Sequence, residues 1–179
     1  MYTREVISNF ANSLIKALEL SRPYDPYLVV DRLGGKVEYD TITDMAIDAS
    51  IRKKDQDSFI IDLNKNKPFL RERFSIAHEP GHLFLHMGFL TDEKVWNSIP
   101  VDDIFQDSVY YRMSGNYTQE ENEANEFAAS FLMPKNEFVE QIQKHTLNGR
   151  VSMLKIADYF DVSTDAAITR AKWLGYVRW

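Results

Sequence analysis

Hydrophobic positions recur with the period of an α-helix in the first part of the chain. In residues 1–20 these positions are Val6, Ile7, Phe10, Leu14, Ile15 and Leu18. The stripe predicts an amphipathic helix that packs one face on the core. A proline-containing break over 21–26 separates it from a short helix predicted over 26–33, which a Gly-Gly pair ends. Residues 36–39 are predicted to form a short strand.

The pattern changes to that of β-strands between residues 49 and 63. A polar tip over 53–57 separates two apolar runs, which predicts a β-hairpin whose second strand covers 58–63. The outer edge of this strand is either covered by its neighbours or open to an extended peptide that pairs by strand addition. A turn that ends with Pro68 then favours the start of a helix, predicted over 69–86.

Residues 87–117 form the least regular part of the chain, with one proline and several acidic and aromatic residues. A connection of this length in a compact domain is typical of a functional or mobile segment. Three interpretations are open: a lid over the site, a segment that supplies a transition-state donor, and a solvated loop.

The second half of the chain is predicted to be helical. Thr118 and Glu121 have the spacing of a capping box, which predicts a helix from 118 to 134. Another helix is predicted to end near 144, and residues 151–175 have the pattern of a helix-turn-helix. We therefore divide the chain into one domain over 1–150 and a helical C-terminal cap over 151–179 that packs on it.

His78, Glu79 and His82 form the spacing H-E-x-x-H within the helix predicted over 69–86. Residues four apart lie on one face of a helix, so both histidines can direct imidazole nitrogens to one divalent metal, for which we expect zinc. Glu79 lies roughly 100° around the helix from His78, beside the metal, where a general base takes a proton from the activated water. His86, one turn further on, is expected to pack rather than to touch the site.

The third metal ligand is expected from the helix that follows Thr118. Glu120 and Glu121 each lie roughly 50° from the centre of its buried stripe, Glu123 lies roughly 110° away, and Glu126 points farther out. The ligand is therefore Glu120 or Glu121, and geometry favours Glu121, whose alternative role is capping alone. Asn125 lies on the same flank, where it is expected to hydrogen-bond a ligand histidine.

Composition limits the classes of protein further. A length of 179 residues fits one domain, or a domain with a small appendage. The net charge of −6 argues against broad binding to nucleic acid or to anionic membranes. The absence of cysteine excludes disulfides and thiolate zinc sites. Without a signal-peptide pattern or a membrane-spanning apolar stretch, the chain is predicted to be cytoplasmic.

The two motif regions resemble those of a known family, the ImmA/IrrE-type metallopeptidases. The family pattern is H-E-x-G-H-x-x-x-H followed by E-x-x-A-N/D-x-F-A-x-x-x-L-M-P, and this chain has the same spacing at 78–86 and 121–134. The resemblance covers nearly the whole chain. It implies an α+β zincin-like fold with a small β-sheet, in which zinc is held by His78, His82 and Glu121 and Glu79 is the general base. It also implies a bacterial or prophage protein that cleaves a helix-turn-helix repressor or accompanies one.

Pro80 departs from the family pattern, which usually has Leu at this position. Inside a helix, proline loses the hydrogen bond to the carbonyl of Ile76 and clashes with it, which costs roughly 3 kcal/mol. Gly81 adds roughly 1 kcal/mol against helix formation. This local strain motivates the alternative that the protein is a catalytically weak or inactive regulator that acts by docking on a partner.

Three functions are therefore compared. The preferred one is a zinc endopeptidase that acts on a repressor, and the second is the docking regulator. The third, a DNA-binding protein that uses the C-terminal helices, is disfavoured because Lys155, Arg170 and Lys172 are balanced by three aspartates in the same segment.

Overall fold

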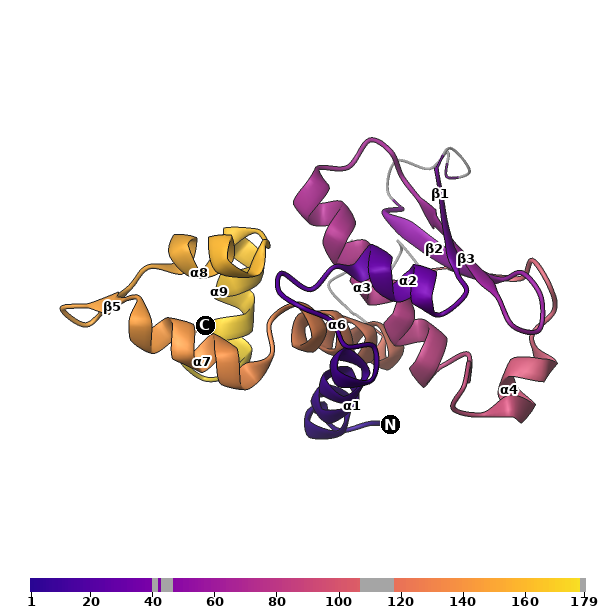
Figure 1. The fold of residues 1–179 in the computed structure, drawn as a ribbon, viewed down its shortest axis with the longest axis horizontal. Coiled ribbons are helices and arrows are strands. Elements are labelled where there is room, and N and C mark those ends of the chain that lie inside the picture. Colours follow the sequence, from indigo (N-terminus) through magenta and orange to yellow (C-terminus); the bar gives the residue numbers. More distant parts are fainter. Residues whose placement is uncertain (40–41, 43–46, 107–117, 178–179) are drawn as a thin grey trace.

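The computed structural model describes residues 1–39, 42, 47–106 and 118–177 (Figure 1). A small β-sheet lies at one end of the molecule, and the last helices of the chain lie at the other. Two helices lie between these ends: α3 (Phe69–Leu85) and α6 (Gln119–Leu132). The predicted α+β class is confirmed.

Two capped helices precede the sheet. α1 (Arg4–Ala17) begins at Thr3, whose side-chain oxygen accepts a hydrogen bond from the backbone N–H of Val6. α2 (Pro26–Arg32) begins in the same way at Asp25. Both helices fall within the ranges that the hydrophobic pattern predicts.

The sheet has the strand order β1-β3-β2-β4. Its strands are β1 (Lys36–Tyr39), β2 (Ala49–Lys53), β3 (Phe59–Leu63) and β4 (Ile104–Gln106). β2 and β3 form the predicted antiparallel hairpin, and β1 runs parallel to β3. β4, which the sequence pattern did not reveal, pairs antiparallel with the other side of β2.

Of the two alternatives for the edge along residues 58–63, the covered edge is the one that the structure contains. β3 pairs with β2 on one side and with β1 on the other, so both of its edges are occupied. A local alternation of apolar residues identifies a strand but does not say which strands flank it. Within the described residues, the edge strands are β1 and β4.

The two faces of the sheet carry different side chains. One row crosses all four strands in register and consists of Val37, Ile61, Ile51 and Phe105. This apolar row continues the core that α3 covers. On the opposite face, Arg52 donates hydrogen bonds to carboxylates from three segments: Glu38, Asp62 and Asp102. Because neighbouring residues of a strand point to opposite faces, the sheet is apolar toward α3 and charged on its other side.

α3 is continuous through Pro80 and ends only at Leu85. The Pro80 ring is buried in an apolar cluster that includes Val29 and Phe131. Apolar burial therefore offsets part of the local cost that proline brings to a helix.

Gly81 lies where α3 crosses α6. A Cβ atom added to Gly81 would lie 2.8 Å from the Cα atom of Ala124 and 3.2 Å from its carbonyl oxygen. Contacts this short to a backbone require one helix to shift, so only glycine permits the observed approach. Gly81, which disfavours a helix locally, therefore sets the distance between α3 and α6, the two helices that carry the predicted ligands.

Short elements complete the C-terminal part. They are α7 (Lys135–Lys144), β5 (Thr146–Leu147), β6 (Arg150–Val151), α8 (Met153–Phe160) and α9 (Thr164–Trp173). The two predicted short helices correspond to α8 and α9. The hydrophobic pattern did not reveal the β5–β6 hairpin, whose turn is formed by Asn148 and Gly149. Their φ angles of 50° and 75° are those that a two-residue hairpin turn requires.

Two buried arginines form hydrogen bonds between the C-terminal helices and the rest of the protein. Arg170 of α9 is 1% exposed and donates hydrogen bonds to Glu126 (2.8 Å) and Ser130 (3.1 Å) of α6. Arg73 of α3 donates to the backbone carbonyl of Asp161, in the turn between α8 and α9. Because removing one partner of a buried ion pair is strongly destabilising, these contacts hold the cap in one position.

The expectation that Glu123 and Glu126 point away from the core is wrong. Both are buried, because α6 is covered by α1 and α9 as well as by α3. Arg170, counted from the sequence as a possible phosphate contact, is used inside the protein. Its burial strengthens the argument against direct DNA binding by α9.

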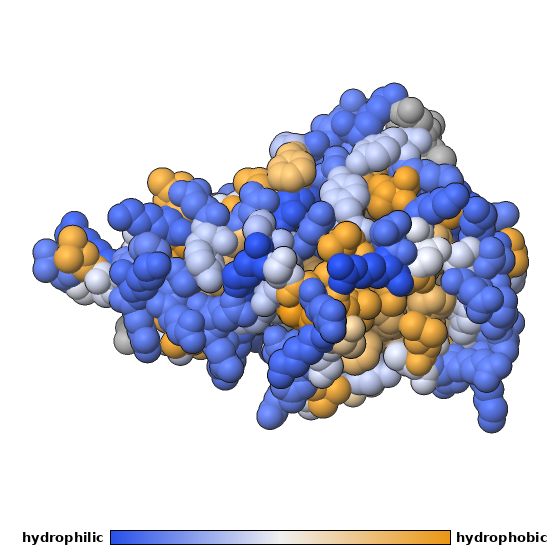
Figure 2. Space-filling view, viewed as in Figure 1, coloured by the Kyte–Doolittle hydropathy of each residue, from blue (hydrophilic) through white to orange (hydrophobic). Residues whose placement is uncertain are grey.

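Hydrophilic residues dominate the face shown in Figure 2, and its apolar residues gather near the middle, around α1 and α2. Leu90, Leu147 and Leu154 are highly exposed but come from separate segments of the fold. None of the described helices is long and apolar enough to cross a membrane.

Substitutions at the two unusual positions of α3 are expected to have opposite effects on the melting temperature. Helix propensity alone favours both changes, by about 1 kcal/mol for Gly81→Ala and about 3 kcal/mol for Pro80→Leu. Overpacking of Gly81→Ala against Ala124 costs about 1–3 kcal/mol, so we expect this variant to melt lower and Pro80→Leu to melt higher than the wild type. Thermal unfolding followed by circular dichroism tests both. A Gly81→Ala variant that melts at or above the wild-type temperature would contradict the close-approach argument, and a destabilised Pro80→Leu would show that α3 has adapted to the proline.

Candidate metal centre

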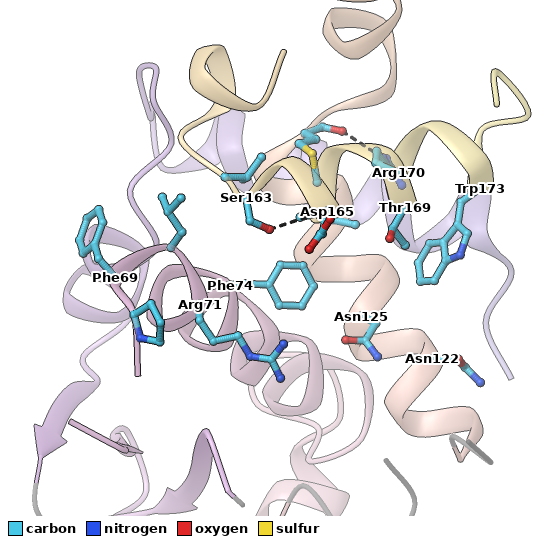
Figure 3. Close-up of a pocket in the computed structure, with 16 residues that line it drawn as sticks. Phe69, Arg71, Phe74, Asn122, Asn125, Ser163, Asp165, Thr169, Arg170 and Trp173 are labelled. Atoms are coloured by element: carbon cyan, nitrogen blue, oxygen red, sulfur yellow. Dashed lines mark hydrogen bonds between the residues drawn. The ribbon is translucent and has the colours of Figure 1, made fainter. Parts of the chain in front are cut away.

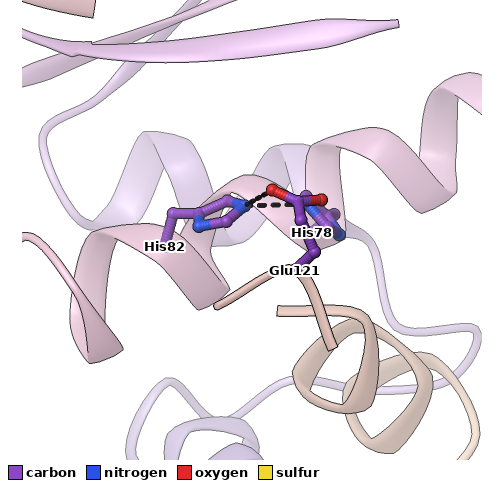
Figure 4. A group of neighbouring side chains, drawn as sticks. All are labelled: His78, His82 and Glu121. Carbon is purple, nitrogen blue, oxygen red and sulfur yellow. Dashed lines mark hydrogen bonds and ion pairs between the residues drawn. The ribbon is translucent and has the colours of Figure 1, made fainter. Parts of the chain in front are cut away.

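His78 and His82 project from the same face of α3, one turn apart, as the motif predicts (Figure 4). Both side chains are buried, with 2% and 0% of their surface exposed. Their Nε2 atoms lie 2.9 Å apart, so each ring directs the same nitrogen toward one point. Pro80, between them in the sequence, does not separate them.

Glu121 reaches the same point from the first turn of α6 (Figure 4). Thr118 caps this helix by accepting a hydrogen bond from the backbone N–H of Glu121. The Glu121 carboxylate oxygens lie 3.6 Å from Nε2 of His78 and 3.4 Å from Nε2 of His82. Of the two candidates for a third ligand, the structure brings Glu121 to the histidines, whereas Glu120 is exposed.

The three side chains fit a zinc ion in both chemistry and spacing. Their ligand atoms all lie within 4.8 Å of one another. In a tetrahedral site with ligand distances of about 2.0–2.1 Å, the ligand atoms lie about 3.3 Å apart. The separations of 2.9, 3.4 and 3.6 Å lie around this value. Two imidazoles and one carboxylate are also a ligand set of catalytic zinc sites, which keep a fourth position for water.

Asn125 orients the first of the two histidines. Its Oδ1 atom lies 3.1 Å from Nδ1 of His78, which is the contact expected from the sequence. An amide oxygen accepts a hydrogen bond from Nδ1–H, and this tautomer leaves the lone pair of Nε2 available to a metal.

His86 takes part in the polar contacts of the site, so the prediction that it simply packs is wrong in part. Its Nδ1 atom lies 3.0 Å from Nδ1 of His82, and its Nε2 atom lies 3.3 Å from Oε2 of Glu123. The ring also stacks on Phe105, at 6.1 Å between centroids and 14° between planes. The sequence argument missed the polar contacts because they need Glu123, which was placed away from the core.

Burial and hydrogen bonding set the charges of this pair. Burial lowers the pKa of His86 and the neighbouring His82 lowers it further, against the opposing effect of its hydrogen bond to Glu123. Burial alone would raise the pKa of Glu123, but hydrogen bonds from Gln119, the backbone N–H of Tyr2 and His86 lower it overall. Near neutral pH, His86 is therefore a neutral imidazole and Glu123 a carboxylate.

β4 brings an aromatic side chain to the same place. The Phe105 ring lies 4.8 Å from the ring of His82. No strand was predicted here, because a three-residue strand is too short to show an alternation of apolar and polar residues. The three interpretations of residues 87–117 stay open, because residues 107–117 lie outside the described residues.

Glu79 occupies the same turn of α3 as the histidines and is 1% exposed. Its position roughly 100° from His78 keeps it out of the ligand set. The role of general base, which the motif predicts for Glu79, stays a prediction.

A groove of about 790 Å³ opens between α3, α6 and α9 (Figure 3). Aromatic side chains from two of these helices line it: Phe69, Phe74 and Trp173. Asn125 forms part of the wall, so this groove and the metal centre share one side chain. The C-terminal cap therefore contributes to a concave surface directly beside the centre.

The fold and the three converging side chains define a zincin-like α+β protein with an H-E-x-x-H helix and a separate glutamate helix. The chain belongs to the IrrE N-terminal-like domain family, whose model matches residues 30–172 and which is classed as a peptidase family. The resemblance stated from the motifs is thereby confirmed.

A solved structure described as a Mycobacterium tuberculosis transcriptional regulator is similar to this protein, with a TM-score of 0.60 and 18% sequence identity. The match covers 99% of this chain and 49% of that one, so this chain spans about half the length of that protein. At this identity the likeness concerns the fold. Comparison with curated proteins gave no match.

Asn125→Ala is expected to weaken zinc binding about 10–100-fold, the usual effect of removing a hydrogen bond to a ligand histidine. Asn122→Ala is the matched control, because Asn122 lies one turn earlier on α6 and lines the same groove, but is exposed. Zinc affinity measured by competition with a chelating indicator tests the pair. Equal affinities for both variants would show that the His78–Asn125 contact does not orient the ligand.

Proposed function

We propose that this protein is a zinc-dependent endopeptidase that hydrolyses a peptide bond in a partner protein. The observation that carries the proposal is the convergence of His78, His82 and Glu121, with Glu79 in the same helical turn. Membership of a peptidase family supports it. We propose the cytoplasm as its site of action and a repressor as its substrate.

His78, His82 and Glu121 are the residues that would hold zinc, and a bound zinc ion supplies the Lewis acidity that lowers the pKa of a water to about 7. The carboxylate of Glu79 takes the proton from the attacking water and delivers it to the amide nitrogen as the C–N bond breaks. Asn125 keeps the His78 ring in the orientation that the centre needs. His78, Glu79, His82 and Glu121 are buried, which strengthens the electrostatic interactions among them.

We infer that the substrate segment pairs with β4 rather than with β3. Within the described residues, β4 has a strand on one side only, and its Phe105 contacts His82 and His86. An extended peptide added to this edge would therefore pass next to the metal centre. The groove beside Asn125 gives the folded part of the partner a second surface to contact.

The proposed partner is a helix-turn-helix repressor. The family resemblance points to it, and the similar M. tuberculosis protein is described as a transcriptional regulator. The alternative of a docking regulator without catalysis was motivated by Pro80. Because α3 is continuous and the Nε2 atoms of His78 and His82 converge, Pro80 gives less reason to expect an inactive protein. Zinc binding and cleavage assays distinguish the two functions.

The purified wild type is expected to bind about one zinc per chain, and His82→Ala is expected to lose it. The reason is that His82 supplies one of three ligands in a site with no cysteine. Metal analysis after dialysis measures the stoichiometry, and His145→Ala, at the only histidine outside α3 and its C-cap, controls for surface binding. The same zinc content in the wild type and His82→Ala would exclude the assignment.

Glu79→Gln is expected to abolish cleavage while zinc content and melting temperature stay at wild-type values. Loss of the general base lowers the rate by about 10²–10⁴-fold, whereas the amide retains the size of the carboxylate. The test is co-expression with the helix-turn-helix repressor encoded nearest to the gene, followed by intact-mass analysis of the repressor and a pull-down.

A discrete repressor fragment that is absent with Glu79→Gln would support the peptidase. Stable binding of an intact repressor by the wild type would instead favour the docking regulator. Neither binding nor cleavage would leave the repressor without a role as partner.

A further inference from the structure

The side chains of His82, His86 and Glu123 form a continuous hydrogen-bonded row. The row runs from Nδ1 of His82 to Nδ1 of His86 over 3.0 Å, and from Nε2 of His86 to Oε2 of Glu123 over 3.3 Å. It links two residues of the α3 segment to α6, the helix that also carries Glu121. The row therefore joins a predicted ligand of one helix to the helix of another ligand.

The direction of each hydrogen bond follows from the role of His82. A neutral imidazole that presents the lone pair of Nε2 to a metal carries its proton on Nδ1. Nδ1–H of His82 then donates to the bare Nδ1 of His86, which leaves the proton of His86 on Nε2, where it donates to Glu123. One proton on each ring thus satisfies every contact in the row.

Glu123 is fixed independently of the histidines. Its Oε1 atom accepts hydrogen bonds from the side chain of Gln119 (2.7 Å) and the backbone N–H of Tyr2 (3.0 Å). Oε2 is the oxygen that faces His86. The carboxylate therefore holds a fixed orientation, with one oxygen anchored and the other directed to the row.

Phe105 encloses the row from the sheet side. Its ring stacks on His86 and lies 4.8 Å from His82, and the side chains of His86 and Glu123 are each 8% exposed. A hydrogen bond from imidazole to carboxylate in such a poorly solvated place is stronger than the same contact in water.

We propose that His86 and Glu123 are positioning residues that orient His82 and raise its basicity as a metal ligand. The proposal rests on the metal centre proposed above but not on peptide hydrolysis. It gives the two ligand histidines different supports: His78 is held by the neutral amide of Asn125, and His82 by an imidazole backed by a carboxylate. Among the described residues, His86 is the one seen to link His82 to a carboxylate of α6.

The test compares zinc affinity among variants at His86, with Zn²⁺ as the probe and a chelating indicator as competitor. His86→Phe keeps a ring that stacks on Phe105 but removes both nitrogens, so its affinity should fall about tenfold or more. His86→Gln offers an amide oxygen toward His82 and an amide N–H toward Glu123, so its affinity should lie nearer to that of the wild type. His145→Phe, at the C-cap of α7, is the matched control and should bind as the wild type does.

Two further measurements separate positioning from a merely structural role. The apo forms should melt at similar temperatures, and the visible absorption spectrum of the Co²⁺-substituted protein should change in His86→Phe but not in His145→Phe. Glu123→Gln gives an independent variant of the same row, with an intermediate loss of affinity expected, should His86→Phe fail to fold.

If folded His86→Phe has the zinc affinity and cobalt spectrum of the wild type, the positioning role is overturned while the metal centre stays intact. If His86→Phe does not fold, the same result in Glu123→Gln overturns it. A wild type that binds no zinc would overturn both proposals. Loss of affinity in His86→Phe with rescue by His86→Gln supports the row, even in a protein that cleaves no peptide.

Discussion

The close crossing of α3 and α6 is the constraint on which the rest of the structure depends. At Gly81 the helices approach so closely that a single added carbon would meet the backbone of Ala124. His78 and His82 lie on either side of this point in α3, and Glu121 and Asn125 lie around it in α6. A wider crossing would separate the carboxylate from the imidazoles by more than a metal ion can bridge. The glycine therefore serves the site through the distance between helices rather than through its own chemistry.

The sequence was sufficient for features that depend on local spacing. The helical ranges, the β2–β3 hairpin and the convergence of His78 with His82 follow from periods of 3.6, 2 and 4 residues, and the structure contains them all. It was insufficient for features that depend on which distant segment arrives beside a residue. β1 pairs with β3 and β4 pairs with β2, and because neither pairing can be read from residues 58–63 alone, the sequence left the state of that edge open. His86 was taken for a packing residue because its partner Glu123 lies 37 positions away.

The same distinction explains why the position of a residue around α6, measured from its buried stripe, predicted the direction of Glu121 correctly but that of Glu126 wrongly. Angles measured from a single apolar stripe assume that a helix has one buried face. α6 is instead surrounded, with α3, α1 and α9 on different sides. A carboxylate that points away from the stripe then meets another element rather than solvent, and it is stable there only with a partner. Arg170 is that partner for Glu126, and it comes from a helix that the sequence argument treated as a separate cap.

α6 thus uses three carboxylates in three different contacts. Glu121 faces the histidines of α3, Glu123 faces His86 and the backbone of Tyr2, and Glu126 faces α9. Because successive residues are rotated by about 100°, these positions cannot all point to one side, and each fixes the rotation of the helix through a different contact. A rotation that improved one contact would break the other two. The orientation of Glu121 toward the metal position is therefore determined as much by the contacts of Glu123 and Glu126, outside the ligand set, as by the ligand set itself.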